Sequence, residues 1–243
     1  MICVGIFGYG KMGKEIYNLI NGSMSVNKIE IYHENGDIDD FIDKTDLILD
    51  FSINSATEFL ADKLVQRSKV PKALLVGTTN LSGPTKEKLS QISKRTAIMA
   101  ASNVTIGAFL LKKISASLAK SLGSEYDIDI IETHHKEKID APSGTAKDVA
   151  LAIQSAITQG KFEIKTPRDA LDPRSAGEIR ITSIRAGRNA GIHEVLFSGE
   201  FDSFSIIHRM ENRKLLAKAA INAGLWLTCQ KNGLYTIDDM FLL

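Results

Sequence analysis

The stretch from Glu132 to Ala146 gathers more side chains suited to acid–base chemistry than any other part of this chain. Two adjacent histidines, His134 and His135, are followed by Lys138 and then by a Pro-Ser-Gly-Thr turn. Imidazole titrates near neutral pH and can donate a proton, and a lysine can stabilise a carboxylate or a developing carbanion. This combination is what a site for a small dianionic substrate would need.

The elements around this stretch explain how it would be positioned. Apolar residues predict a strand over 126–133, and the pattern that follows predicts a helix from Thr145 to about Ile157. Ser143, Gly144 and Thr145 would then stand at a helix start, where backbone amides and the positive dipole end favour a carboxylate. The alternative is that Ser143 or Thr145 only caps the helix and that the histidines hydrogen-bond locally.

The histidine pair does not predict a metal site. Adjacent side chains on a strand point to opposite faces, so His134 and His135 cannot both face one ligand unless the chain turns there. No further histidine, cysteine or carboxylate stands at ligand spacing nearby. We therefore expect no metal and interpret one histidine as a proton donor.

A glycine turn follows the first apolar run, Ile2–Phe7. It reads Gly8-Tyr9-Gly10-Lys11-Met12-Gly13 and leads into residues with helical spacing of apolar side chains. In a dinucleotide fold the first glycine permits a tight turn, the second lets the backbone approach a pyrophosphate, and the third allows close helix–strand packing. The strand before and the helix after favour dinucleotide binding over an ordinary strand–turn–helix.

Further strands are predicted at Lys28–Tyr32, Leu47–Leu49, Ala73–Val76 and Ala97–Ala101, with a helix at Ser55–Arg67. Each strand ends in small or polar residues, which would line one crevice of a doubly wound sheet, although such residues also simply make turns. Glu34 follows Gly13 by about 20 residues, where these folds place a carboxylate for the adenosine ribose. The alternative interpretation is that Glu34 is a solvated acidic residue in a loop, without a ligand.

The second half of the chain no longer alternates strands and helices regularly. We predict a helix at Ile106–Leu122 and a long loop at Thr158–Ala176 that contains Pro167 and Pro173. Strands are predicted at Glu178–Arg185, Glu194–Ser198 and Ser203–His208, and a last helix at Asn212–Gln230 is expected to pack back on the first domain. The fold class is therefore α/β, with a Rossmann-like dinucleotide-binding domain (1–103 and 212–243) plus a second α+β domain with a mixed, antiparallel-rich sheet (104–211) for substrate binding and oligomerisation.

A second polar cluster accompanies the predicted strands of that domain. A hairpin-like connection carries Arg185, Arg188 and His193, and other strand and helix ends carry His208, Arg209 and Arg213. These groups could bind the second carboxylate of a dianion, make subunit contacts or be solvated.

Composition excludes several classes of function. The 30 basic and 29 acidic residues nearly cancel, which argues against nucleic-acid and membrane-surface partners. No run of about 18 apolar residues and no signal-peptide pattern is present, and Cys3 and Cys229 have no metal or redox spacing. A cytoplasmic protein is expected.

At this point the residues carry a specific resemblance. The stretch Asp129 to His135, with Lys138, Asp140 and 142–146, closely resembles the motif of the 4-hydroxy-tetrahydrodipicolinate reductase (dihydrodipicolinate reductase) family. The likeness covers the whole chain and includes Gly10-Lys11-Met12-Gly13, Asp50-Phe51-Ser52, Gly77-Thr78-Thr79, Ser102-Asn103, 183–187 and 193–195.

The resemblance implies a reductase of the diaminopimelate route to lysine that uses NADH or NADPH to reduce a cyclic dicarboxylate. By this likeness His134 is the proton donor, Lys138 the catalytic lysine, and His135, Gly144 and Thr145 substrate contacts, to which we add Ser143. The implied cofactor residues are Gly8, Tyr9, Gly10, Lys11, Met12, Gly13, Glu34, Gly77, Thr78, Thr79, Ala101, Ser102, Asn103 and Val104. A homotetramer joined through the sheets of the second domain is also implied.

The cofactor choice and two rival functions remain open. No arginine follows the second strand, and His33 with Lys11 would have to meet a 2′-phosphate against Glu34. We therefore expect both cofactors to be used, with a lean to NADH. Another two-domain dehydrogenase would share the glycine turn but has no reason to carry the histidine–lysine motif, and a non-catalytic dinucleotide sensor would tolerate its loss.

Overall fold

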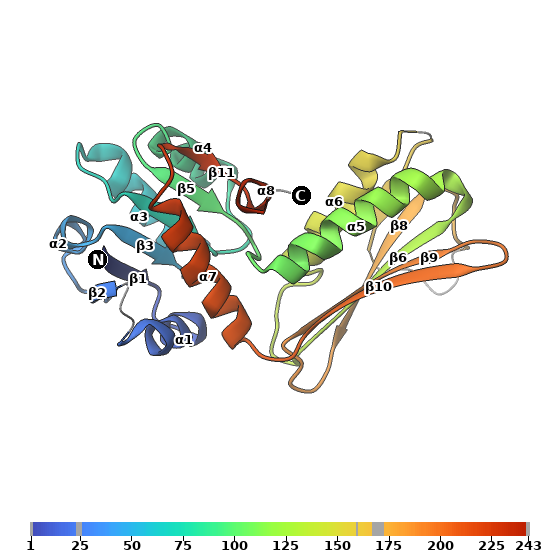
Figure 1. Ribbon diagram of the computed structural model, residues 1–243, viewed down its shortest axis with the longest axis horizontal. Coiled ribbons are helices and arrows are strands. Elements are labelled where there is room, and N and C mark those ends of the chain that lie inside the picture. The colour runs from blue at the N-terminus through green and yellow to red at the C-terminus, as the bar shows by residue number, and fades with distance from the viewer. Residues whose placement is uncertain (1, 23–25, 159, 167–172, 242–243) are drawn as a thin grey trace. The chain divides into compact units, whose positions relative to one another are not determined.

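The computed structural model describes residues 2–22, 26–158, 160–166 and 173–241, which form two compact units (Figure 1). Unit 1 comprises 1–105 and 214–243, and unit 2 comprises 106–213. These boundaries lie two residues beyond those expected from the sequence. No helix among the described residues is both long and apolar enough to span a membrane.

Unit 1 contains a six-stranded parallel sheet in the order β11-β5-β4-β3-β1-β2. Its strands are β1 (Ile2–Phe7), β2 (Val26–Tyr32), β3 (Leu47–Asp50), β4 (Ala73–Val76), β5 (Ala97–Ala100) and β11 (Gly233–Tyr235). Its helices are α1 (Lys11–Ile20), α2 (Ile38–Lys44), α3 (Asn54–Gln66), α4 (Gly83–Ile92), α7 (Lys214–Leu227) and α8 (Ile237–Met240). The continuous apolar strands are buried because helices cover both faces, as in other doubly wound sheets.

Helix α7 returns to unit 1 as the sequence predicted, and packs on α1, β3 and β4. Small residues make this close approach possible, since a Cβ atom on Gly224 would lie 2.7 Å from the side chain of Leu49. The short helices α2 and α4 and the elements β11 and α8 were not expected from the sequence. Side chains cap both α2 and α4. The Asp37 side chain accepts hydrogen bonds from amides of α2, and the Ser82 side chain accepts one from an amide of α4.

Unit 2 contains a five-stranded sheet in the order β10-β9-β6-β8-β7, with α5 (Ile106–Leu122) and α6 (Gly144–Ala156) packed on one face. The strands are β6 (Asp127–His134), β7 (Glu163–Lys165), β8 (Glu178–Arg185), β9 (Gly191–Ser198) and β10 (Ser203–Met210), and a short 3-10 helix covers Gly123–Glu125. β6 pairs antiparallel with β9 and parallel with β8. The sheet is mixed, as predicted, but it is not rich in antiparallel pairs, because the described strands of unit 2 form two parallel and two antiparallel pairings.

Two local predictions in unit 2 were wrong. The connection predicted to carry His193 is not a hairpin, because β6 lies between β8 and β9 in the sheet, and Gly191, Ile192 and His193 already belong to β9 and pair with β10 as far as Met210. The predicted loop at 158–176 contains β7, which pairs in parallel with β8. Residues 159 and 167–172 of that loop, Pro167 among them, lie outside the described residues.

Candidate active site

The predicted cofactor residues follow strands that end at one edge of the sheet in unit 1. In the sheet register Phe7 pairs with Tyr32 and Asp50, Asp50 with Val76, and Val76 with Ala100, so these parallel strands finish side by side. The chain winds outward in both directions from β1 and β3, which makes this edge the switch point where doubly wound folds bind ligands.

The glycine turn has the geometry that a pyrophosphate site requires. Gly8 has a φ of +94°, and a Cβ atom there would lie 2.7 Å from the backbone nitrogen of Ser52. A Cβ atom on Gly13 would lie 2.2 Å from the carbonyl oxygen of Gly8, so only glycine lets α1 pack this closely. Gly10 has open space around its Cβ position and precedes the first amides of α1. The residues present therefore fit a dinucleotide phosphate at the helix start.

The predicted cofactor residues that follow β1 and β2 lie in or near the glycine turn. The Tyr9 ring packs edge-on against Tyr17, Met12 packs against the apolar core, and Lys11 is the exposed first residue of α1. Glu34 is exposed two residues beyond β2, the strand next to β1. Its position is compatible with the predicted ribose contact.

A buried carboxylate ties together the loops that follow β3 and β4. Asp50 accepts hydrogen bonds from the backbone nitrogen and hydroxyl of Ser52 (2.9 and 2.5 Å), from Thr57 Oγ1 (2.6 Å) and from Thr78 Oγ1 (3.2 Å). Burial raises the pKa of Asp50, and these hydrogen bonds oppose the shift. In the sequence Asp50 stood out only within the Asp50-Phe51-Ser52 motif after a predicted strand, and its partners could not be inferred because Thr78 lies on another strand's loop.

The remaining predicted cofactor residues lie in the loops that follow β4 and β5, at the same edge of the sheet. A Cβ atom on Gly77 would overlap the Phe51 ring at 2.1 Å, and Thr79 is exposed. Ala101 donates its amide to Val76, and Ser102 is half-buried. Asn103 Oδ1 accepts from the backbone nitrogen of Thr105 at 2.9 Å, and Val104 is buried.

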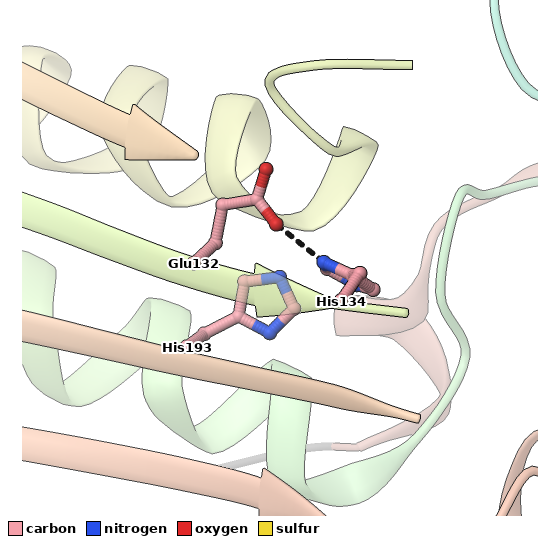
Figure 2. A group of neighbouring side chains, drawn as sticks. All are labelled: Glu132, His134 and His193. Carbon is pink, nitrogen blue, oxygen red and sulfur yellow. Dashed lines mark hydrogen bonds and ion pairs between the residues drawn. The ribbon is translucent and has the colours of Figure 1, made fainter. Parts of the chain in front are cut away.

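In unit 2, His134 is the last residue of β6, and Glu132 lies two residues earlier on the same buried face. His134 Nδ1 hydrogen-bonds to Glu132 Oε2, as Figure 2 shows. Arg185, at the end of β8, donates from Nη2 to Glu132 Oε1 at 2.7 Å and from Nη1 to Oε2 at 3.0 Å. Sequence reasoning missed Glu132, although its period-two spacing from His134 on a predicted strand was a usable signal.

His193 joins this group from the neighbouring strand β9, where it pairs with Glu132. The rings of His134 and His193 lie 5.1 Å apart, nearly perpendicular to each other. Burial, followed by repulsion from His134, lowers the pKa of His193 to about 3, so it is neutral at physiological pH. His193 was predicted as part of a polar cluster in a connection and is instead buried in the sheet.

The same group holds the start of α6. His193 Nε2 lies 3.0 Å from Ser143 Oγ, and Ser143 is the N-cap whose hydroxyl accepts from the amide of Ala146 at 3.2 Å. The amide of Ser143 donates to Glu132 Oε1 at 3.3 Å. The capping interpretation is confirmed for Ser143, and direct substrate contact by its hydroxyl stays a prediction. Gly144 and Thr145 form the first turn behind it.

The segment between β6 and α6 carries the other predicted catalytic groups. His135 lies just beyond the strand and donates its amide to Asn189. Lys138 is largely buried, and its Nζ lies 2.7 Å from Asp140 Oδ1. The peptide bond between Ala141 and Pro142 is cis. His134, Lys138 and the start of α6 thus belong to one short connection of unit 2.

The predicted arginine cluster divides in the structure. Arg185 points inward to Glu132 and the Asp140 carbonyl, so it is not available to a substrate carboxylate. Arg188 and Arg209 are exposed and line a surface cavity of about 290 Å³ with Glu211.

Metal-ligand spacing does occur here, which corrects the expectation that no other ligand group lies near His134. Glu132, His134 and His193 offer donor atoms within 4.8 Å of one another, the one such group among the described residues. Both oxygens of Glu132 accept from Arg185, His134 or Ser143, and His193 Nε2 bonds to Ser143. The arrangement is therefore better described as a hydrogen-bonded network.

Comparison with known families gives two matches that together span nearly the whole chain. Residues 2–104 match the family described as "Dihydrodipicolinate reductase, N-terminus", and residues 107–241 match "Dihydrodipicolinate reductase, C-terminus".

Individual relatives agree with these matches. The chain is 34% identical over 242 residues to a 4-hydroxy-tetrahydrodipicolinate reductase of Campylobacter lari, with 98% of both chains covered. It is 32% identical over 235 residues to the enzyme of that name from Syntrophobacter fumaroxidans, covering 96% of this chain and 85% of the relative. A solved dihydrodipicolinate reductase from Paenisporosarcina sp. TG-14, with dipicolinate bound, has a TM-score of 0.74 at 22% identity over the full length of both chains, which shows a shared fold.

Proposed function

The chain belongs to the dihydrodipicolinate reductase family, and we propose how its two units carry out the family's reaction. It is an oxidoreductase that reduces 4-hydroxy-tetrahydrodipicolinate to tetrahydrodipicolinate, with a nicotinamide cofactor, in the diaminopimelate pathway of lysine biosynthesis. One hydride and one proton are consumed, and the 4-hydroxyl group leaves as water. The buried His134, paired with Glu132 at the end of β6, is the observation that supports a proton-donating role best.

Unit 1 binds the cofactor in this proposal. The bound nicotinamide supplies the hydride, and the protein supplies orientation. The glycine turn and the first amides of α1 hold the pyrophosphate, which the open position at Gly10 supports. Asp50 holds the loops after β3 and β4, and with the loop after β5 they complete the cofactor shell through Gly77–Thr79 and Ala101–Val104.

Unit 2 binds the dicarboxylate and delivers the proton. His134 donates the proton, and Lys138 supplies a positive charge beside the developing carbanion. The first turn of α6, Gly144 and Thr145, receives one carboxylate at its positive dipole end. His135 contacts the substrate from the segment just beyond β6.

The expected cofactor preference follows from the carboxylate beyond β2. Glu34 is exposed there and would repel the 2′-phosphate of NADPH. We propose use of both cofactors with a lean to NADH. A preference for NADPH of more than about tenfold in kcat/KM, roughly 1.4 kcal/mol, would refute the lean.

A homotetramer assembled through unit 2 is proposed from the face of its sheet that α5 and α6 leave uncovered. Cross-strand pairing places five half-buried or exposed apolar residues on that face: Ile131, Ile184, Ile192, Leu196 and Ile207. Light scattering should give four chains, and Ile184→Glu with Ile207→Glu should dissociate them. We also propose a cytoplasmic location, which the free thiols of Cys3 and Cys229 support.

The activity test follows NADH and NADPH oxidation at 340 nm with substrate generated by the preceding synthase. Substrate-dependent oxidation, abolished in a His134→Gln/Lys138→Ala double variant, is expected. Cofactor binding without turnover by the unmodified protein would contradict the proposed function and favour a dinucleotide sensor. Full complementation of a lysine auxotroph by the double variant would contradict the roles of these two residues.

A further inference from the structure

We propose that Glu132 is a positioning residue that holds His134 with its Nδ1 proton donated inward, so that Nε2 is the atom that delivers the proton to the substrate. This inference rests on the proposed function of His134. It assigns a role to a residue that the sequence motif leaves unexplained.

The geometry fixes which nitrogen of His134 is engaged. Glu132 and His134 lie two residues apart on the same face of β6, and Nδ1 of His134 meets the Glu132 carboxylate on that face (Figure 2). An ionised carboxylate only accepts hydrogen bonds, so Nδ1 must carry a hydrogen. Nε2 points toward the start of β9, where a Cβ atom on Gly191 would lie 3.2 Å from it. Nε2 is therefore the nitrogen left for proton transfer.

Glu132 remains ionised although it is fully buried. Burial alone would raise the pKa of Glu132, but hydrogen bonds from His134, Arg185 and Ser183 outweigh it and hold the pKa well below its usual value. The bidentate Arg185 pair supplies the compensating charge that a buried carboxylate needs. The acceptor for Nδ1 is thus permanent at neutral pH.

The same carboxylate also reaches the proposed substrate cradle. Oε1 accepts the amide of Ser143, the N-cap of α6, while His193 holds the hydroxyl of Ser143. One buried group therefore fixes the proton donor relative to the helix start that would bind the substrate carboxylate. If Ser143 only capped the helix, the position of His134 and the position of the start of α6 would be independent of each other.

The proton transfer is then fully specified at His134. The imidazolium gives its Nε2 proton to the substrate carbon, and the Nε2–H electron pair becomes the lone pair of the neutral ring. The Nδ1 proton stays with the ring, bonded to Glu132. Solvent returns a proton to Nε2 before the next turnover.

The charged and titratable groups near His134 come from four elements. Glu132 shares β6, Arg185 ends β8, and His193 faces the ring from β9. Lys138 and, from β10, His208 act electrostatically on His193. Ser143, the N-cap of α6, is uncharged and bonds to His193. Glu132 is thus the anion in direct contact with the imidazole.

Two substitutions that break the same ion pair separate positioning from a structural role. Glu132→Gln keeps the shape and an acceptor but removes the anion that favours the protonated ring, so kcat/KM is expected to fall about tenfold or more and its alkaline limb to move to lower pH. Arg185→Met removes the opposing cation, so its alkaline limb is expected to stay or to move to higher pH. If the Glu132–Arg185 ion pair were purely structural, both variants should lose the same thermal stability, and the alkaline limbs of their kcat/KM profiles should not move in opposite directions.

An unchanged alkaline limb in Glu132→Gln, or a shift of both variants in one direction, would overturn the inference. The Kd for NADH, measured by fluorescence, should be unchanged in both variants. If the unmodified protein does not turn over, the proposed function fails. If it turns over and His134→Gln is impaired while Glu132→Gln keeps the normal profile, the positioning role alone fails.

A second measurement needs no change in the network. Nitrogen-15 spectra of labelled histidine, with the His134 signal assigned by its loss in His134→Gln, report the tautomer in the unmodified protein. The neutral ring is expected to carry its proton on Nδ1. A neutral ring protonated on Nε2 would refute the inference even if the Glu132 variant fails to fold.

Discussion

Replacing Asp50 tests whether one buried carboxylate holds the loops at the edge of unit 1 that we propose binds the cofactor. Asp50→Ala removes the acceptor for Ser52, Thr57 and Thr78. Ser52 is half-buried and its donors can be hydrated, whereas Thr57 and Thr78 are only 1% and 7% exposed. A buried donor left without a partner costs about 1–3 kcal/mol, so the two threonines predict a loss of about 2–6 kcal/mol in the free energy of unfolding.

Asp50→Asn is the matched control because it keeps the shape and one acceptor oxygen. Burial raises the pKa of Asp50 above the value of 3.8 expected for an unperturbed aspartate. The folded state then holds its proton to a higher pH than the unfolded chain, so the contribution of this group to stability falls as the pH rises from 3.8 through the raised pKa. Asparagine carries no charge, and its loss at neutral pH should be well below that of alanine.

The assay is urea unfolding followed at Trp226, the single tryptophan of the chain, which lies on α7 in unit 1. The NADH Kd is measured in parallel, and it should rise in Asp50→Ala because the loops after β3 and β4 lose their common anchor. An unfolding midpoint and slope equal to those of the unmodified protein would refute the reasoning. Equal losses for alanine and asparagine would show that charge, rather than the hydrogen bonds, matters.

Three further predictions concern the turn, the network and the sheet. Alanine at Gly13 places its Cβ atom 2.2 Å from a backbone oxygen and should lower the free energy of unfolding in urea by about 1–3 kcal/mol. Alanine at Gly10 should lower it by about 1 kcal/mol or less, yet should weaken NADH binding. Equal free energies of unfolding for the two variants would contradict this prediction. His193 has a pKa lowered from 6.5 to about 3, so between these pH values the unfolded chain binds one more proton and stability should fall by up to about 1.4 kcal/mol per unit as the pH drops. This slope should flatten in His193→Asn, and a wild-type slope in that variant would exclude His193 as its source. Gly191→Ala crowds His134 Nε2 at 3.2 Å and should lower kcat several-fold without changing the NADH Kd; an unchanged kcat would show that the ring has room to move.

Local signals in the sequence were sufficient for most of the secondary structure. Apolar runs gave β1 and β4 at their observed bounds, and helical periodicity gave α5. The helix at 38–44 does space Ile38, Phe41 and Ile42 at i, i+3 and i+4, but the pattern spans only two turns and was not used. The helix at 83–92 has only Leu89 and Ile92 as buried apolar residues, and side-chain caps at Asp37 and Ser82 help to define the two starts. Strand β7 is only three residues long and is defined by its pairing with β8, which no local pattern encodes.

The motif proposed as catalytic was visible in the sequence, but the network that supports it was only partly so. Glu132 and His134 share a face because strand side chains alternate, and this could have been read from a single strand. His193 lies far along the chain and reaches them only through the antiparallel register that pairs it with Glu132. The inward turn of Arg185 depends on the parallel pairing of β8, so it could not be distinguished in advance from a substrate contact.

The central place of β6 in its sheet has a consequence for local opening of the molecule. Strands β9 and β8 flank it and β10 and β7 lie outside them, so no edge of β6 is open to solvent. Segments with paired backbone on both sides open only with the larger cooperative unit around them. The amides of β6 should therefore exchange with deuterium among the slowest in unit 2, and the proposed proton donor at its end, His134, should keep its geometry until that unit unfolds as a whole.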